Sequence, residues 1–346
     1  MRKIIIIFSL LLIVSVSVFV LDYRLNNQQN LIAKKNPIII GLSLGNTKEE
    51  RWPKDRDFFV KRAQELGAIV NITSADNIDT QISQIENLIS QGVKVIVVIP
   101  ADSEKIAPEI KKAKAAGVKI IAYDRLIKST DVDLYISFDN EKVGRLEASG
   151  LVALAPQGKY AYIGGPTSDN NSALLKKGTM AELNNPKIKS GDIKLVINTA
   201  ANSWEPEEAY NIIKKYLNSG GALDAVIASN DGLASGVRKA LKEKDPDNKV
   251  LISGQDAELS ACQRIIAGTQ TTTVYKQIDL LADKAAEIAV ALAQGKMPVT
   301  NQTVNNGQAD IPEILIEPIL VNKDNMIETI VKDGFHTYED IYQNSK

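Results

Sequence analysis

The sequence predicts an α/β protein made of two doubly wound lobes, each a parallel sheet covered by helices on both faces. Apolar runs of four to seven residues alternate with amphipathic stretches of about twelve residues, as parallel strands and their crossover helices do. Glycines follow three helical stretches, at Gly92, Gly117 and Gly221, where a left-handed cap is expected. The alternation continues for too long to form one sheet, so we predict two lobes.

The strands predicted from the apolar runs are, in order, residues 38–44, 68–72, 93–99, 119–123, 160–163, 194–197, 225–228, 250–253 and 272–275. Between them, apolar residues recur at helical spacing, for example at Ile82, Ile85, Leu88 and Ile89. A second example is the set Phe58, Phe59, Ala63 and Leu66 between the first two strands. The helices are therefore expected to bury one apolar stripe each against a sheet.

The N-terminal segment, residues 1–21, predicts a transmembrane anchor or a signal sequence. Arg2 and Lys3 precede eighteen residues without a charge, which as a helix would nearly match the bilayer core of about 30 Å. A small-residue cleavage pattern after the apolar core is poor and no Cys follows, which favours a retained anchor. Residues 22–36 have the polar composition of a linker. We expect an extracytoplasmic body tethered to the membrane.

The composition excludes several classes of function. The chain has 41 Lys and Arg against 42 Asp and Glu, so the basic surplus typical of general nucleic-acid binding is missing. With one His, His336, a multi-His metal site is excluded, and Ser–His or Cys–His hydrolase chemistry would depend on that residue. Cys262, the one cysteine, is expected to pack in a helix over residues 258–266. Phosphate-binding glycine motifs and an EF-hand loop are also missing, so we predict no cofactor and no metal.

Polar residues directly after the predicted strands mark a candidate binding site. In open α/β sheets, ligands bind beyond the carboxyl ends of the strands. The polar groups at these positions are Glu50-Arg51-Trp52, Asp124-Arg125, Asp169-Asn170-Asn171, Asn230-Asp231, Asp256 and Lys276. Carboxylates, amides and guanidinium groups suit a neutral polyol, because each hydroxyl both donates and accepts. The indoles of Trp52 and Trp204 can pack against the C–H face of a sugar ring.

Each of these residues has a structural interpretation as well. Asp124-Arg125 can form a surface turn with an exposed ion pair, and Asn230 can cap the following helix. Lys276 can be an ordinary solvated lysine, and Trp52 can cover an edge of the core. The functional interpretation rests on six loops of similar chemistry at the same edge of the sheets.

Nine stretches, in order along the body, give the chain a resemblance to a known family. They are 50–57 (ERWPKDRD), 122–125 (AYDR), 135–144 (YISFDNEKVG), 169–171 (DNN), 228–231 (ASND), 253–257 (SGQDA), 267–271 (AGTQT), 274–276 (VYK) and 332–336 (KDGFH). From residue 38 to about residue 336 the chain resembles the D-xylose-binding proteins of the type I periplasmic binding protein class, in the ribose/galactose-binding cluster.

The resemblance implies both a ligand and a domain organisation. The implied sugar contacts are Arg51, Asp124, Arg125, Asn171, Asn230, Asp256 and Lys276, with Trp52 and Trp204 as aromatic walls. Asp169 either contacts the sugar or orients Asn171.

The resemblance also implies two lobes joined by a three-stranded hinge. Lobe one would contain residues 37–138 and 277–307, and lobe two would contain residues 139–276 and 308–346. The lobes are expected to close on D-xylose.

Two partners are possible for the closed form. The predicted anchor favours a co-receptor that modulates a membrane sensor histidine kinase, and the alternative is delivery of D-xylose to an ABC permease. A glycosidase with Asp124 and Asp256 as paired carboxylates is disfavoured, because Arg125 and Lys276 would keep both acids ionised. A sugar-responsive transcription regulator is disfavoured because an apolar run stands where a DNA-binding helix-turn-helix would be expected. We therefore predict a binding protein and not an enzyme.

Overall fold

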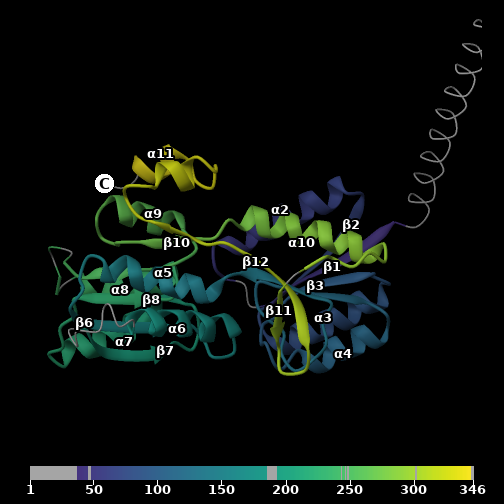
Figure 1. Cartoon of the computed structure of the whole chain (residues 1–346), viewed down its shortest axis with the longest axis horizontal. Coiled ribbons are helices and arrows are strands. Elements are labelled where there is room, and N and C mark those ends of the chain that lie inside the picture. Colours follow the sequence, from purple (N-terminus) through teal and green to yellow (C-terminus); the bar gives the residue numbers. More distant parts are fainter. Residues whose placement is uncertain are drawn as a thin grey trace, which may run out of the picture.

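The computed structural model describes residues 37–45, 48–184, 193–242, 244–245, 247, 249–300 and 302–343. These residues form two α/β lobes that lie side by side along the long axis of the molecule (Figure 1). The predicted anchor and linker, residues 1–36, lie outside the described residues. Among the helices that are described, none has the length and hydropathy needed to cross a membrane.

Lobe one contains a seven-stranded sheet with the order β11-β12-β5-β4-β3-β1-β2. Its strands are β1 (Ile38–Gly45), β2 (Ala68–Ala75), β3 (Val95–Ile99), β4 (Lys119–Tyr123), β5 (Leu134–Phe138), β11 (Gln302–Asn305) and β12 (Asp310–Ile316). All neighbours are parallel except β11, which pairs antiparallel with β12. Every residue of the interior strand β3 is buried, as expected for a strand covered on both faces.

Two pairs of helices cover this sheet. They are α2 (Arg51–Glu65) and α10 (Ile278–Ala293) on one face and α3 (Ile78–Ser90) and α4 (Ala107–Ala115) on the other (Figure 1). Each pair of helices forms a separate hydrophobic core with its face of the sheet. Phe59 and Ala63 of α2 lie in one core, and Ile85 and Leu88 of α3 lie in the other. The apolar residues that recur at helical spacing in the sequence therefore lie on the buried faces of these helices.

Lobe two repeats the topology with a four-stranded parallel sheet of order β7-β6-β8-β9. Its strands are β6 (Gly158–Gly164), β7 (Ile193–Ala200), β8 (Ala225–Ala228) and β9 (Leu251–Ser253). A two-stranded antiparallel ladder of β10 (Thr273–Tyr275) and β13 (Ile319–Val321) extends it through a bridge between Gln255 and Val274. The order reverses beside β1 in lobe one and beside β6 in lobe two, which is where a ligand site is expected.

The helices of lobe two cover both faces of its sheet. They are α5 (Asn140–Val152), α6 (Asn170–Leu183), α7 (Pro206–Asn218), α8 (Asp231–Leu241), α9 (Leu259–Ile266) and α11 (Tyr338–Tyr342), with a short π-helix, η1 (Ile327–Val331). Helices α7 and α8 share one core, and α5 and α6 pack on the opposite face. Cys262 of α9 is buried in a further cluster with η1 and α11, as a packing residue.

The position of the last crossover corrects the sequence-based boundaries. The chain passes between the lobes after Phe138 and again between β10 and α10. Residues 308–346 were assigned to lobe two, but β12 pairs with β5 in lobe one, with Ile316 opposite Phe138. The third crossover therefore follows Ile316. Pro312 and Glu313 interrupt the apolar run of β12, and this is why the periodicity did not reveal the strand.

Three other elements differ from the sequence prediction. β5 was missed because a loop without a helix connects it to β4, which breaks the expected alternation. β11 and β13 are short and only partly buried, so they lack a continuous apolar signal.

Gly92 and Gly117 have positive φ values of 74° and 80°, as predicted for left-handed caps at the ends of helices. After α7, however, the left-handed residue is Gly220, at 82°, and not Gly221.

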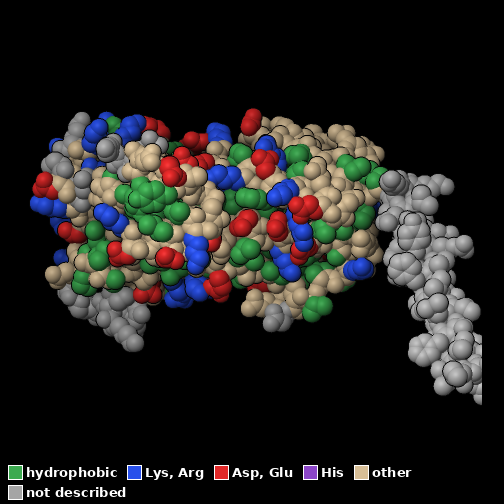
Figure 2. Space-filling view, turned by 90° about the horizontal axis from the view of Figure 1, so that it is seen from above, with side chains coloured by type: hydrophobic (Ala, Val, Ile, Leu, Met, Phe, Trp, Pro, Cys, Tyr) green, Lys and Arg blue, Asp and Glu red, His purple; other side chains and the backbone are tan. Residues whose placement is uncertain are grey.

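The surface over α2, α9, α10 and α11 shows basic and acidic side chains in close mixture (Figure 2). This view contains no large field of one sign, in keeping with the formal net charge of −1. Nothing on this face therefore suggests a polyanionic partner.

The close packing of α5 on α6 provides a test of the fold. A Cβ atom on Gly178 would lie 1.9 Å from the carbonyl oxygen of Glu141, which is backbone and cannot move aside easily. We expect Gly178→Ala to lower the free energy of unfolding by about 1–3 kcal/mol. Urea unfolding followed by circular dichroism measures this. Lys176→Ala, on the exposed side of α6, is the control, and equal stability of the two variants would contradict the prediction.

Candidate functional site

The loops at the carboxyl ends of the strands place the candidate side chains between the lobes. Arg51 and Trp52 form the first turn of α2, after β1, and Asp124 and Arg125 follow β4. In lobe two, the remaining candidates follow β6, β7, β8, β9 and β10, in the order Asp169, Asn171, Trp204, Asn230, Asp256 and Lys276. All ten predicted residues line one cavity.

Two further residues, Glu49 and Gln255, line the same cavity and were not singled out in the sequence. Both belong to loops that the sequence did identify, since Glu49 precedes Arg51 by two positions and Gln255 adjoins Asp256. The signal that could have found them is their place directly after a strand. Gln255 Nε2 donates to the carbonyl oxygen of Ser229 at 2.6 Å, which ties two of the site loops together.

Arg51 is the central cation of the cavity and is only 4 % exposed. Its Nε and Nη2 atoms donate to Asp55 at 3.0 Å each, and Asp55 also accepts from the Tyr123 hydroxyl at 2.6 Å. Its Nη1 lies 3.0 Å from Asp124 Oδ2 and 3.6 Å from Asp256 Oδ1. Arg51 thus contacts a carboxylate of each lobe.

Asp124 is a buried carboxylate that remains ionised. Burial by itself would raise the pKa of Asp124, but the charges of Arg51, Lys276 and Arg125 outweigh burial and lower it below its usual value. The residue has a φ of 60°, in the left-handed region, and its carbonyl oxygen accepts from the Ser137 hydroxyl at 2.6 Å. The conformation is thus fixed by neighbouring groups, and the carboxylate is aimed into the cavity.

Several contacts join the lobes across the cavity. Asn171 Nδ2 donates to Asp124 Oδ1 at 3.0 Å, and Arg125 Nε lies 2.9 Å from Asp169 Oδ2. Away from the cavity, the backbone N–H of Ser103 donates to the carbonyl oxygen of Ser168 at 3.1 Å. The structure is therefore in a closed arrangement of the two lobes.

The sequence analysis offered a purely structural role for several of these residues, and the structure supports that role for Asn230 and Trp52 but not for Asp124, Arg125 and Lys276. Asp124, Arg125 and Lys276 are 3 %, 5 % and 3 % exposed, so none of them forms a surface turn or is a solvated lysine. Asn230 does cap α8, because its Oδ1 accepts from the N–H of Leu233 at 2.7 Å, and it also lines the cavity. Trp52 does pack in the core of lobe one, and it too lines the cavity.

Asp169 has two partners besides Arg125. Its Oδ1 accepts from the N–H of Asn171 at 2.9 Å, which caps α6 and orients Asn171. Its Oδ2 accepts from Trp204 Nε1 at 3.3 Å, so the indole wall is held in place. The carboxylate is therefore occupied by the protein, although it lines the cavity.

Comparison with known proteins identifies the family. Residues 40–297 match the model of the periplasmic binding protein domain. The chain belongs to the periplasmic binding protein family. It is similar to the D-xylose-binding periplasmic protein of Escherichia coli (strain K12), with 48 % identity over 309 residues, which cover 89 % of this chain and 93 % of the relative. The D-xylose-binding periplasmic protein of Haemophilus influenzae is also 48 % identical, over 90 % of this chain and 94 % of the relative.

Solved structures agree with this family assignment. A carbohydrate transporter solute binding protein from Chloroflexus aurantiacus, in complex with D-glucose, superposes with a TM-score of 0.80 at 31 % identity. The match covers 87 % of this chain and 97 % of that chain. The bilobed architecture predicted from the sequence is therefore that of the family.

The periplasmic binding protein cavity holds acceptor atoms that lack hydrogen bonds. Among the described residues that line it, the buried atoms without any such partner are Asn171 Oδ1 and Gln255 Oε1, whereas Asp124 Oδ2 and Asp256 Oδ1 lie within 4 Å of Arg51 Nη1. A buried acceptor without a donor costs about 1–3 kcal/mol. A ligand with several hydroxyl groups supplies donors at all these places, so the cavity has the chemistry of a polyol site.

The lowered pKa of Asp124 predicts how the stability of this family member depends on pH. Because the folded chain binds this proton less tightly than the unfolded chain, the stabilisation is complete above the ordinary pKa of about 3.9 and is lost as the pH falls through the lowered value. We expect Asp124→Asn to lower the free energy of unfolding by about 1–3 kcal/mol at neutral pH. The difference from wild type should shrink below about pH 3, and urea titrations at both pH values measure it. A difference independent of pH would show that the charge is not its cause.

Proposed function

We propose that this protein binds D-xylose outside the cytoplasm and delivers it to an ABC permease. The observation that carries the proposal is the convergence of all ten candidate residues on one cavity between two closed lobes. The choice of sugar is supported by two relatives that are 48 % identical over about nine tenths of both chains and are D-xylose-binding periplasmic proteins.

The sugar would be held by residues from both lobes, and this explains how binding could close them. Lobe one contributes Arg51 and Asp124, and lobe two contributes Asn230, Asp256 and Lys276. A sugar can satisfy polar groups of both lobes only when they are closed, so it binds the closed form more tightly and shifts the population towards it. A membrane partner would then recognise the closed conformation.

The indoles complete the proposed sugar site. Trp52 and Trp204 line the cavity from lobe one and lobe two respectively. Each is oriented by a carboxylate, since Trp52 Nε1 donates to Glu49 at 2.6 Å and Trp204 Nε1 donates to Asp169 at 3.3 Å. Two fixed apolar faces together with polar edges match a pyranose ring, which is polar at its rim and apolar on its faces.

Hydrolysis of a glycoside is a poorer match to this geometry. The candidate acids Asp124 and Asp256 both lie within 4 Å of Arg51 Nη1, at 3.0 Å and 3.6 Å. A general acid requires a raised pKa, whereas the pKa of Asp124 is lowered. The arrangement favours a carboxylate that accepts hydrogen bonds from a bound sugar over one that donates a proton.

The solved structures favour the permease over the partner that the sequence analysis favoured. The two D-xylose-binding relatives named above do not support a co-receptor for a sensor histidine kinase. Similar structures include an ABC transporter solute binding protein from Clostridium phytofermentans with bound β-D-glucose. That structure has a TM-score of 0.80 and 27 % identity. The membrane tether, on which the co-receptor interpretation rested, falls on residues outside the described part of the chain.

Isothermal titration calorimetry with D-xylose tests the ligand. We expect saturable heat for wild type, and Asp256→Asn or Lys276→Met should weaken binding about tenfold or more, because each removes a buried partner of the sugar. The control is Lys105→Gln, since Lys105 is 72 % exposed and lies outside the cavity. Wild-type protein that gives no heat with D-xylose, D-glucose or D-ribose would refute a sugar-binding function.

The permease is tested in cells. If the protein delivers sugar, deletion of its gene should slow uptake of labelled D-xylose at low concentration and leave induction of the uptake genes largely intact once sugar enters by other routes. Affinity purification from membranes in the presence of D-xylose should recover permease subunits. Recovery of a histidine kinase without permease, together with loss of induction, would restore the co-receptor interpretation.

A further inference from the structure

The KDGFH stretch at residues 332–336 carries part of the family resemblance but does not line the sugar cavity. It connects η1 to α11 and lies next to β10 and α9 (Figure 1). Its last residue, His336, is the one histidine of the chain and is 7 % exposed. The contacts of this histidine lead to one loop of the site.

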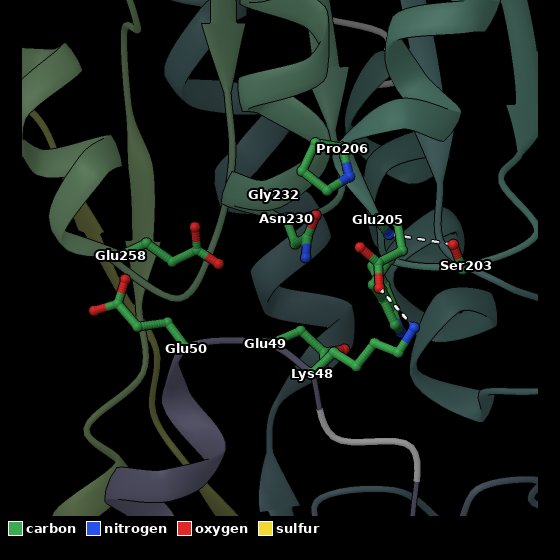
Figure 3. A pocket seen from close by; sticks show the side chains of 10 residues that line it. Lys48, Glu49, Glu50, Ser203, Glu205, Pro206, Asn230, Gly232 and Glu258 are labelled. Atoms are coloured by element: carbon green, nitrogen blue, oxygen red, sulfur yellow. Dashed lines mark hydrogen bonds and ion pairs between the residues drawn. The ribbon is translucent and has the colours of Figure 1, made fainter. Parts of the chain in front are cut away.

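That loop, residues 254–258, connects β9 to α9 and has an unusual backbone. It presents Asp256 to the inner cavity, the one lined by the ten candidate residues, and ends at Glu258, which lines a second pocket that adjoins this cavity (Figure 3). Asp256 has a φ of 91° and Ala257 a φ of 51°. Residues with a Cβ atom rarely adopt left-handed values, and then mostly singly and not in pairs. The loop therefore depends on its surroundings to keep this shape.

Three hydrogen bonds hold the two left-handed residues. The N–H of Asp256 donates to the carbonyl oxygen of Val274 at 2.9 Å, and the N–H of Ala257 donates to Thr273 Oγ1 at 3.2 Å. Both acceptors belong to β10, which lies beside the loop. The third bond comes from the opposite end of the chain, since His336 Nε2 lies 2.9 Å from the carbonyl oxygen of Ala257.

The imidazole of His336 is the donor in this third bond. A carbonyl oxygen can only accept, so Nε2 carries the hydrogen. Burial and then the charge of Lys54 lower the pKa of His336, so the ring is neutral near neutral pH and has one N–H to give. The other side chain at this carbonyl is Cys262, whose Sγ lies 3.5 Å away and is a weak donor. His336 therefore supplies the stronger hydrogen bond.

Neighbouring aromatic and charged groups fix the imidazole in place. The ring of Phe335 meets it edge to face, with centroids 4.6 Å apart, and Phe335 also lies 5.0 Å from the ring of Tyr275. Tyr275 is the last residue of β10, directly before the crossover to lobe one. Lys54 of α2, in lobe one, lies 4.3 Å over the ring of Phe335. The stretch that carries His336 is thus held between the hinge and both lobes.

We propose that His336 is a positioning residue for the sugar, because its hydrogen bond to Ala257 holds the left-handed loop that aims the Asp256 carboxylate into the inner cavity. The inference rests on the proposed sugar-binding function and adds a residue to it. Asp256 Oδ1 lies 3.5 Å from Lys276 Nζ and 3.6 Å from Arg51 Nη1. A group that binds a ligand has to be held within about 0.5 Å of its productive position, so a small shift of the loop weakens binding.

Variants with and without a donor at position 336 test the hydrogen bond. His336→Phe keeps an aromatic ring beside Phe335 but has no N–H, and we expect it to weaken D-xylose binding about fivefold. His336→Gln has an amide N–H of similar reach and should recover most of the wild-type affinity. Isothermal titration calorimetry measures the dissociation constants, and circular dichroism checks that each variant is folded. Unchanged affinity in His336→Phe, or an equal loss in both variants, would overturn the proposal.

Thr337→Val is the matched control, because it perturbs the same segment without removing a donor to the loop. Thr337 adjoins His336 and caps α11, since its Oγ1 accepts from the N–H of Asp340 at 3.1 Å. We expect this variant to be less stable but to bind D-xylose as wild type does. A loss of affinity equal to that of His336→Phe would show that the stability of the C-terminal segment, and not the hydrogen bond, supports binding.

A double-mutant cycle tests whether His336 acts through Asp256. Asp256→Ala removes the carboxylate that is to be positioned, so His336→Phe should change the affinity of this variant by less than about twofold, against about fivefold in wild type. Equal fold-changes in both backgrounds would overturn the positioning role and leave the sugar-binding function standing. Wild-type protein that gives no heat with D-xylose, D-glucose or D-ribose would overturn both.

Discussion

One buried guanidinium group, that of Arg51, holds the site together. It donates twice to Asp55 and contacts Asp124 of lobe one and Asp256 of lobe two within 4 Å. Removing it would leave three buried carboxylates without their common cation, and an uncompensated buried charge costs about 3–5 kcal/mol. Because of this cation, together with Lys276 and Arg125, Asp124 can stay ionised although it is buried.

The inner cavity and the pocket that adjoins it differ in how their carboxylates are paired with cations. In the inner cavity every carboxylate has a cation within 4 Å, since Glu49 and Asp169 pair with Arg125 while Asp124 and Asp256 pair with Arg51. The adjoining pocket, which shares Glu49, Trp204 and Asn230 with the inner cavity, has Glu50, Glu205 and Glu258 among its lining residues and Lys48 as its one lining cation (Figure 3). The carboxylates of the inner cavity are thus each held by a cation of the protein.

The repeated topology of the lobes explains how residues so distant in sequence meet. Each sheet reverses its strand order beside its first strand, β1 or β6, and the carboxyl ends of both sheets face the space between the lobes. Loops after β1 and β4 then oppose loops after β6, β8 and β9. The acceptors without a partner, Asn171 Oδ1 and Gln255 Oε1, lie in the cavity where these two sets of loops meet.

The sequence by itself determined the α/β alternation and most strands of both sheets, and together with the family resemblance it indicated ten of the twelve residues that line the cavity, because apolar runs and the polar residues that end them are local signals. Glu49 and Gln255 were missed although they stand in the same loops, since their residue types are common in ordinary turns. Only the tertiary structure decided that β12 returns to lobe one, because its interrupted apolar run is specified by pairing with β5 and not by its own pattern. It alone also decided that Asn171 reaches Asp124 and that Arg125 reaches Asp169, because contacts between the lobes depend on how the two sheets pack against each other.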